Sequence, residues 1–469
     1  MFPAGGSLSQ RMSPLVHIVM FAWIPVVIGL FSRLKPRHAV IASILIAWLF
    51  LPNAEYSIPG FPNYNKMSAT CLGILMAAAM FDLENLSRFR LRALDIPLIV
   101  WCLCPLASSL ANGYGLYDGL SGVFRQTVTW GFPYLIGRVY FNNLEGLKEL
   151  ALGIFIGGMI YVPLCLYESR MSPQLHYQLY GFYQHSFAQT YRWGGWRPMV
   201  FMSHGLMVGA WMMSASLIGV WLYKAGVLKN FRGVPASLML VLLLATTVWC
   251  KSLAAIGLML AGMGILLLSS RFGKPLFLIL LVAVPLFYIP ARATGAWSEE
   301  GLISFIEEHI SQQRAESLEY RMGNETILAE KAMQRPIFGW GTWGKARVYD
   351  EQGRDISVTD GLWIIALGNH GLVGLMSLTL SILMPVFLLL RTCPARYWAH
   401  PRIAPVAVLS VLLGLYMVDN LLNAMINPVF MLAAGGIAGL TQLSAPVGEP
   451  LPAAGKTPAA RLAYAPRFL

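Results

Sequence analysis

Apolar runs of membrane-spanning length recur along the whole chain, and they constrain its fold more than any other feature. The first run reads LVHIVMFAWIPVVIGLF, and similar runs follow as far as residue 443. Crossing the hydrocarbon core takes about 20 apolar helical residues, and only helices or closed barrels satisfy their backbone polar groups there. Only 12% of the residues are charged, against roughly 25% in soluble domains. We therefore predict an all-α, polytopic helical membrane bundle.

The runs predict about 12–13 spans in a single bundle over residues 1–443. They lie near 15–31, 39–52, 67–81, 96–111, 127–141, 150–167, 203–223, 236–250, 252–269, 276–290, 366–390, 404–419 and 429–443. The first run is long for a signal peptide and lacks a small-residue cleavage site, so we interpret it as the first span. The tail 444–469 is rich in Pro and Ala and is predicted to be disordered.

The loops predict how the bundle is oriented. Short basic loops lie at 32–38, 88–92, 224–232, 270–274 and 391–402. The positive-inside rule places such loops in the cytoplasm, and it accounts for the net charge of +12 without a nucleic-acid partner. Two long polar loops, 168–203 and 291–361, then lie on the outer face. The tail would lie in the cytoplasm, and the N-terminus outside if 39–52 spans.

The second long loop, which precedes the last three predicted spans, holds twelve of the chain's 22 acidic residues. Its stretch from Arg314 to Gln334 places Arg321, Glu325 and Leu328 at helical spacing on one face. Pro336 is expected to end that helix. We predict a partly helical loop that covers the outer end of the bundle.

Three cations are predicted to lie at the outer ends of spans: Arg197, Lys251 and Arg321. Guanidinium forks match phosphate oxygens, and an ammonium adds a compact positive charge. Cations that converge repel one another unless an anion joins them, so together they would bind a diphosphate without a metal. For each residue alone, snorkelling to lipid head groups remains an alternative. Arg125 is a further candidate of the same kind.

Aromatic residues and one carboxylate add to this outer face. Tyr191, Trp193 and Trp196 suit stacking on sugar rings, or else they belong to an interfacial aromatic belt. Asp360 stands where the second loop re-enters the membrane, and it could orient or deprotonate a sugar hydroxyl. Its alternative role is to cap the following helix. His370 lies further in and could act as a base, although a histidine in such a position is more often a packed interfacial residue.

Several familiar motifs are absent from the sequence. It contains no Walker A motif, no GxGxxG after a strand, no HExxH and no CxxC. None of its six cysteines falls in a long polar loop, which argues against a disulfide framework. We therefore expect no cofactor and no bound metal, and any reaction here would need an already activated donor.

Four segments in the outer loops and at the spans beside them resemble, in sequence and in order, the signature region of the O-antigen ligase and polymerase family. The corresponding segments read YRMGNETILAEKAMQRPIFGWGTWG, TDGLWIIALGNHGLVGL, RPMVFMSHG and CKSLAAIGLML. The resemblance implies a multi-pass glycosyltransferase of the bacterial inner membrane with its active face in the periplasm. Its partners would be a glycan linked to undecaprenyl diphosphate, an acceptor glycan and membrane lipid. Arg197, Arg321 and Lys251 would bind the diphosphate, and Asp360 would act with the two arginines in catalysis.

The chain departs from the ligase pattern in two places, and the first of them, at Asp360, resembles the branch of the family that extends exopolysaccharide or O-antigen repeat units. Asp360-Gly361 stands where ligases usually carry His-Asn, and Lys251 replaces the usual Arg. A polymerase would also work with a chain-length regulator and other polysaccharide-assembly proteins. Ligase-type transfer to a lipid or protein acceptor remains open. A transporter of lipid-linked glycans is the alternative of another class, although internal repeats typical of transporters are not evident.

Overall fold

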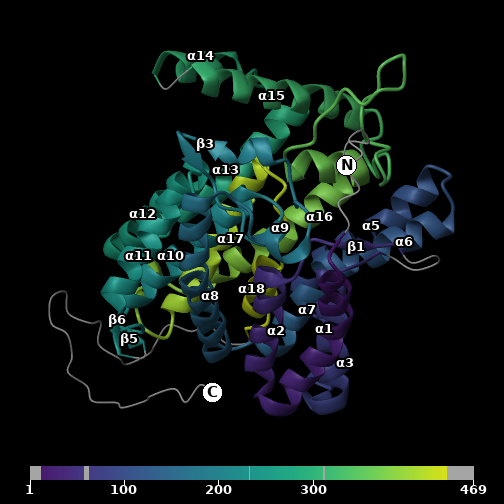
Figure 1. Cartoon of the computed structure of the whole chain (residues 1–469). Coiled ribbons are helices and arrows are strands. Elements are labelled where there is room, and N and C mark those ends of the chain that lie inside the picture. Colours follow the sequence, from purple (N-terminus) through teal and green to yellow (C-terminus); the bar gives the residue numbers. More distant parts are fainter. Residues whose placement is uncertain (1–11, 58–62, 232, 310–311, 441–469) are drawn as a thin grey trace.

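The computed structural model describes residues 12–57, 63–231, 233–309 and 312–440, and they form the predicted all-α membrane bundle (Figure 1). Eight of the described helices are long and apolar enough to cross a membrane. They are α1 (Pro14–Arg33), α5 (Ile96–Ala111, extended by the turn η1, Ala93–Asp95), α8 (Leu144–Met171), α10 (Gly205–Lys224), α12 (Leu253–Phe272), α13 (Leu276–Ala293), α16 (Leu362–Thr392) and α17 (Ala404–Leu422). Four shorter apolar helices accompany them: α2 (Pro36–Phe50), α3 (Lys66–Phe81), α11 (Ala236–Trp249) and α18 (Pro428–Ala438).

Twelve of the thirteen predicted runs coincide with these helices, and the run 127–141 differs. It forms a π-helical turn, Thr127–Gly131, and then the nine-residue α7 (Phe132–Tyr140), which continue α6 (Leu116–Gln126). A helix of nine residues is too short to cross a bilayer alone. Instead α7 packs tightly on α18, because glycines let the two backbones approach closely. A Cβ on Gly137 would lie 2.1 Å from the Leu432 carbonyl oxygen.

The remaining elements are short, apart from α14 and α15. The helices are α4 (Leu83–Ser87), α9 (Leu175–Tyr180), η3 (Phe187–Thr190), α14 (Glu300–His309), α15 (Gln312–Met333) and η4 (Ala395–Tyr397). Three antiparallel hairpins pair β1 (Glu55–Tyr56) with β2 (Tyr64–Asn65), β3 (Tyr191–Arg192) with β4 (Gly195–Trp196), and β5 (Asn230–Phe231) with β6 (Val234–Pro235). The tail 444–469, for which we predict disorder, lies outside the described residues, as does the N-terminus.

The bundle has two chemically different ends. The backbone N–H of Ser13, at the start of α1, donates to the carbonyl of Tyr180 in the first long polar loop. The other end of the 20-residue α1 lies about 30 Å away. Figure 1 shows α14, α15 and β3 at one end, which we call the loop end, and β5 and β6 at the opposite end. We call this opposite end the basic end, because short basic loops meet there. Trp221 Nε1, next to the loop 224–232, donates to the carbonyl of Trp398 in the loop 391–402 (3.0 Å).

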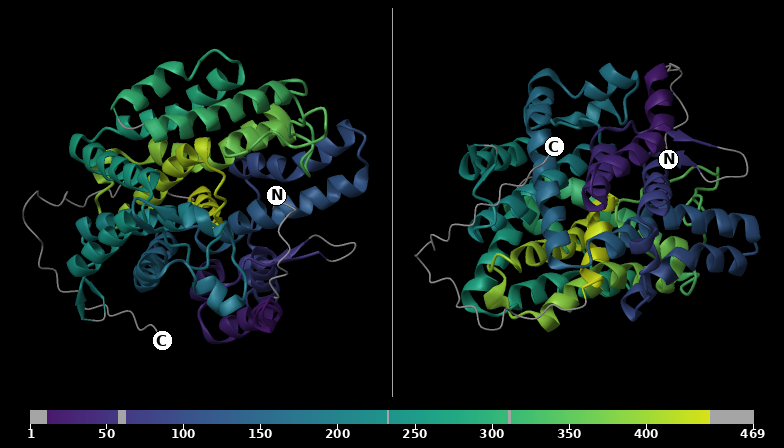
Figure 2. Two further views of the ribbon diagram at one scale, coloured as in Figure 1. Left: turned by 45° about the horizontal axis from the view of Figure 1, so that its top comes forward. Right: turned by 90° about the horizontal axis from the view of Figure 1, so that it is seen from below.

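Burial divides the helices into an inner and an outer set. Trp211 on α10 and Trp363 on α16 are almost fully buried, and most of α17 and α18 is buried with them. By contrast α12 and α13 leave large apolar side chains exposed, including Leu260 (61%) and Phe287 (77%). An exposed apolar surface of this kind suits lipid tails. The helices α5 and α6 project from the side of the bundle, as the two views of Figure 2 also show.

Helix α15 lies across the loop end and packs on α13 and α16. It ends at Met333, three residues before Pro336, as predicted. The segment after it folds back onto a kink in α16 at Gly371, whose φ of 64° suits glycine. A Cβ there would lie 2.3 Å from the Ile337 carbonyl oxygen. Glycine therefore allows the loop to pack directly on the backbone of α16.

Candidate functional site

The hairpin β3–β4 positions the first predicted cation. Its two turn residues, Trp193 and Gly194, have φ of 49° and 68°, the left-handed pair typical of a tight hairpin turn. The chain then leads into Arg197, which is only 7% exposed. Arg197 Nη2 donates to the carbonyl of Lys251 in the turn between α11 and α12 (2.9 Å). The structure thus brings together two cations that lie far apart in the sequence.

Lys251 also reaches the hairpin through its ammonium group. A Cβ on Gly195 would lie only 2.2 Å from Lys251 Nζ, so the glycine leaves room for this side chain. The backbone of Lys251 has φ of 50°, a conformation that non-glycine residues rarely adopt. Such backbone conformations persist where the surrounding structure imposes them and are common at functional sites.

Arg321 and Asp360, the other two predicted polar residues, face each other. Arg321 Nε lies 3.6 Å from Asp360 Oδ2, and the two side chains are 33% and 36% exposed. Arg321 Nη1 also donates to the carbonyl of Leu422 at the end of α17 (3.3 Å). The N-capping alternative for Asp360 is not what the structure has, because Gly361 is the N-cap residue of α16 and no side chain caps it. Both side chains remain accessible to a ligand.

His204 connects these two pairs. It is the N-cap residue of α10, and its Nδ1 accepts from the backbone N–H of Leu206 (3.0 Å). Burial, together with the smaller electrostatic effects of the neighbouring His185, Arg197, Arg192 and Arg321, lowers the pKa of His204 to about 3. Arg197 and Arg321 therefore lie within electrostatic reach of the same imidazole. Since that ring is neutral near pH 7 and Nδ1 accepts, its proton is on Nε2.

We call Arg197, Lys251, His204, Arg321 and Asp360 the outer site. All five lie at the loop end, and the sequence analysis missed one of them, His204. It also missed Asp419 in the last turn of α17, which interacts electrostatically with Arg321 and accepts a hydrogen bond from Asn423 Nδ2 (2.9 Å). A carboxylate inside an apolar span was the available signal, because such groups are usually functional.

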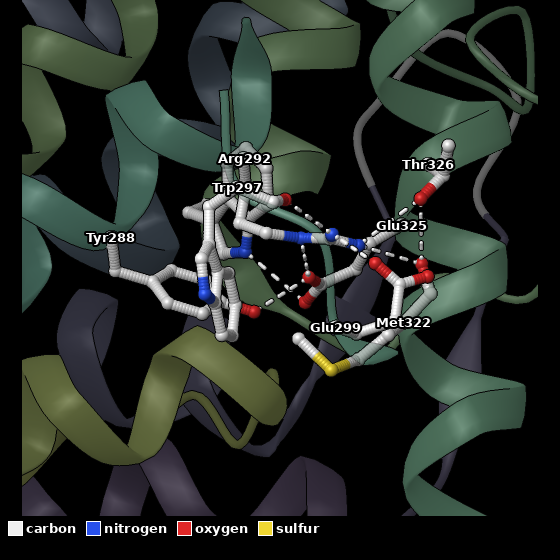
Figure 3. Close-up of polar contacts among 8 residues, drawn as sticks. Tyr288, Arg292, Trp297, Glu299, Met322, Glu325 and Thr326 are labelled. Atoms are coloured by element: carbon white, nitrogen blue, oxygen red, sulfur yellow. Dashed lines mark hydrogen bonds and ion pairs between the residues drawn. The ribbon is translucent and has the colours of Figure 1, made fainter. Parts of the chain in front are cut away.

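A buried polar network fixes α15, and with it Arg321, to the end of α13 (Figure 3). Arg292 Nη1 donates to Glu299 Oε2 (2.6 Å), and Nη2 donates to the Met322 carbonyl (2.9 Å). Tyr288 donates its hydroxyl proton to Glu325 Oε2 (2.7 Å). Burial raises the pKa of Glu325, and its hydrogen bonds and Arg292 oppose that rise. Because Glu325 is one helical turn from Arg321, this network holds the outer-site arginine in place.

The predicted sugar-binding aromatics lie on the hairpin beside Arg197. Tyr191 and Trp193 are 54% and 53% exposed, and Trp196 packs its ring edge-on against Tyr191, with centroids 5.0 Å apart. The exposed rings of Tyr191 and Trp193 can stack on a sugar or lie in an interfacial aromatic belt, so sugar binding remains a prediction.

Arg125 and His370 contact residues outside the outer site. Arg125 stacks on Trp343, with its guanidinium carbon 4.4 Å from the ring centroid. His370 is 2% exposed, lies 3.0 Å from the Ser108 hydroxyl and packs on Trp101. His370 is therefore a packed core residue.

The fold and the outer site define a polytopic membrane protein with a cation-rich site at one end of its bundle. Comparisons with protein-family models, curated proteins and solved structures gave no match. Within the described ranges, no group of three or more His, Cys, Asp or Glu side chains is placed to hold a metal ion. The geometry of the outer site therefore carries the functional argument.

Proposed function

We propose that the protein is an inner-membrane glycosyltransferase that takes a glycan from undecaprenyl diphosphate at the periplasmic face and polymerises exopolysaccharide or O-antigen repeat units. The observation that supports this most is the gathering of Arg197 and Arg321 around His204, with Lys251 next to Arg197. Cations from three distant segments meet at one end, where repulsion among them favours an anionic ligand. The motif resemblance to the O-antigen ligase and polymerase family supplies the identity of that ligand.

In the proposed reaction, the oxygen of an acceptor hydroxyl attacks the anomeric carbon of the donor glycan. The bond between that carbon and the diphosphate oxygen breaks, and its electron pair leaves with the diphosphate. Arg197, Lys251 and Arg321 stabilise the negative charge that grows on this leaving group. Breaking the bond to the diphosphate drives the transfer, so no ATP is consumed.

Asp360 would accept the proton of the attacking hydroxyl. Its carboxylate is paired with Arg321 at 3.6 Å, and both groups are partly exposed. A bound diphosphate would compete for the guanidinium of Arg321, because charge-assisted bonds to phosphate are strong and bidentate. The exchange would release Asp360 toward the acceptor, which links donor binding to activation of the acceptor. Asp419, which interacts electrostatically with Arg321, would help to hold that guanidinium in place.

Reconstitution tests this proposal directly. Purified protein in detergent is incubated with undecaprenyl-diphosphate-linked repeat units, and the products are separated by chain length. Longer chains still attached to undecaprenyl diphosphate are expected for a polymerase. Glycan on a separate lipid or protein acceptor would instead indicate a ligase. Unchanged chain lengths in detergent, together with movement of the lipid-linked glycan across the bilayer when the protein is placed in liposomes, would indicate a transporter and contradict the proposal.

A cellular experiment complements the reconstitution. Arg197→Ala and Arg321→Ala variants, each expressed at the normal level in a strain that lacks the gene, are expected to give short polymer or none. Polymer of wild-type length from both variants would refute the assignment of these residues.

A further inference from the structure

A second cation-rich feature lies at the basic end, away from the outer site. It is a cavity of about 810 Å³ between the α1–α2 turn, the segment after α4, the end of α7 and the start of α8. Sixteen described residues line it, of which six are Lys or Arg and only Glu149 is acidic. The six cations are Lys35, Arg37, Arg88, Arg90, Arg92 and Arg138. We call this cavity the basic pocket.

One of the six cations, Arg138, has a structural role in the wall of the pocket. Arg138 donates from Nε to Asp95 Oδ1 (2.7 Å) and from Nη2 to Asp95 Oδ2 (2.9 Å), and this pair is buried. Arg138 Nη2 also donates to the carbonyl of Arg90 (3.1 Å), and the backbone N–H of Arg92 donates to Asp95 Oδ2 (2.8 Å). Asp95 therefore neutralises Arg138, and the pair fixes the basic segment 88–92 against α7.

The other five cations are compensated to different degrees. Arg88 forms an ion pair with Glu84 on α4. Glu149 lies 4.0 Å from both Arg37 Nη1 and His38 Nε2, so it is shared between them. Among the residues that the structure describes, no carboxylate forms an ion pair with Lys35, Arg90 or Arg92. Unpaired cations that line one cavity repel each other, and a multivalent anion relieves that repulsion.

The surroundings of the pocket are those of a membrane interface. Leu91, between Arg90 and Arg92, is 67% exposed, and Leu83 on α4 is 60% exposed. An exposed leucine between two arginines, with a second exposed leucine on the helix before them, suits a segment at the boundary between acyl chains and head groups. A pocket of a few hundred to a thousand cubic ångströms is also the usual size for a small ligand. The positive-inside rule assigns this end to the cytoplasm, where basic pockets between helices bind acidic head groups.

We propose that the basic pocket binds the phosphate-bearing head group of an anionic phospholipid of the cytoplasmic leaflet. Lys35, Arg90 and Arg92 contact the phosphate oxygens, and Leu91 and Leu83 lie along the acyl chains. Arg138 and Asp95 hold the pocket open and take no part in the binding. This inference stands independently of the reaction proposed for the outer site.

Native mass spectrometry of the full-length protein in detergent tests the proposal. Cardiolipin, phosphatidylglycerol and phosphatidylethanolamine are titrated in turn, with the double variant Arg90→Gln/Arg92→Gln beside the wild type. Arg271→Gln/Arg396→Gln, which removes two exposed cations from the same end but outside the pocket, is the matched control. Each cation near the membrane surface contributes about a factor of five in affinity, so the pocket variant should bind the anionic lipids roughly 25-fold more weakly.

The lipid titration and a competition with pyrophosphate decide the proposal. Wild-type preference for the anionic lipids, lost in the pocket variant and kept in the control, supports it. Equal binding of all three lipids, or equal losses in both variants, overturns it. In a competition experiment, inorganic pyrophosphate is added to the lipid-bound protein. If pyrophosphate displaces no lipid, the proposal stands. If pyrophosphate alone fills the pocket, a soluble phosphate compound is the ligand and the lipid assignment is wrong. Melting temperatures in lipid-free detergent that match the wild type show that both variants fold.

Discussion

We expect Arg321→Ala to abolish most of the proposed transferase activity while leaving the protein folded. The Arg321–Asp360 pair spans 3.6 Å with both side chains about one-third exposed, so it behaves as a surface ion pair worth about 0–1 kcal/mol. The effect on catalysis is larger, because a unit charge about 4 Å from a growing anion contributes about 4 kcal/mol at an effective dielectric constant near 20. Removing one donor of this kind typically lowers kcat by roughly 100- to 1,000-fold.

The assay compares chain extension of lipid-linked glycan with the melting temperature of the same purified sample. Arg354→Ala is the matched control, since Arg354 lies on the same loop, is paired with Asp350 and has a 75% exposed side chain. We expect the control to retain activity and both variants to melt within a few degrees of the wild type. An Arg321→Ala enzyme with wild-type rates would refute the reasoning, as would equal losses in the two variants.

Three further predictions concern the scaffold. Arg292→Ala leaves Glu325 buried without its cation, which should cost about 3–5 kcal/mol and visibly lower the melting temperature; an unchanged melting temperature would show that the network does not anchor α15. Gly371→Ala imposes a Cβ at a φ of 64° and 2.3 Å from the Ile337 carbonyl oxygen, so a loss of at least about 1–3 kcal/mol is expected; a variant as stable as the wild type would contradict the packing described. The folded-state pKa of His204, about 3, lies below the usual imidazole value of about 6.5. The unfolded state therefore binds more protons between these values, so stability falls as the pH drops from about 6.5 toward 3. His204→Asn keeps a helix-capping acceptor and should flatten that dependence, whereas parallel melting curves from pH 8 to 4 would contradict it.

Local patterns predicted much of this structure. Apolar runs gave the helices because a bilayer imposes both length and composition on any segment that crosses it. The helical face bearing Arg321, Glu325 and Leu328 was readable from spacing, and Pro336 marked the end of the same helix. The pairing of Arg321 with Asp360 was harder to foresee, since only their shared position at the loop end connected them.

Features that depend on long-range packing were not predictable. The N-cap position of His204 is local, but its electrostatic interaction with both Arg197 and Arg321 depends on how distant segments pack together. Asp419 gains its role only because the end of α17 meets Arg321. The role of the run 127–141 was also hidden, because its hydropathy does not reveal that α7 pairs backbone to backbone with α18.

The central claim is that the cations of the outer site bind the diphosphate of a polyprenyl diphosphate. Photo-crosslinking with a diazirine-bearing undecaprenyl diphosphate, followed by peptide mapping, locates the bound diphosphate without knowledge of the sugar repeat. We predict labelled peptides around residues 191–204 and 319–326, protection by unlabelled undecaprenyl diphosphate but not by undecaprenol, and loss of labelling in Arg197→Ala/Arg321→Ala. Labelling confined to the basic end, or labelling of the outer site that survives the double substitution, would contradict the claim.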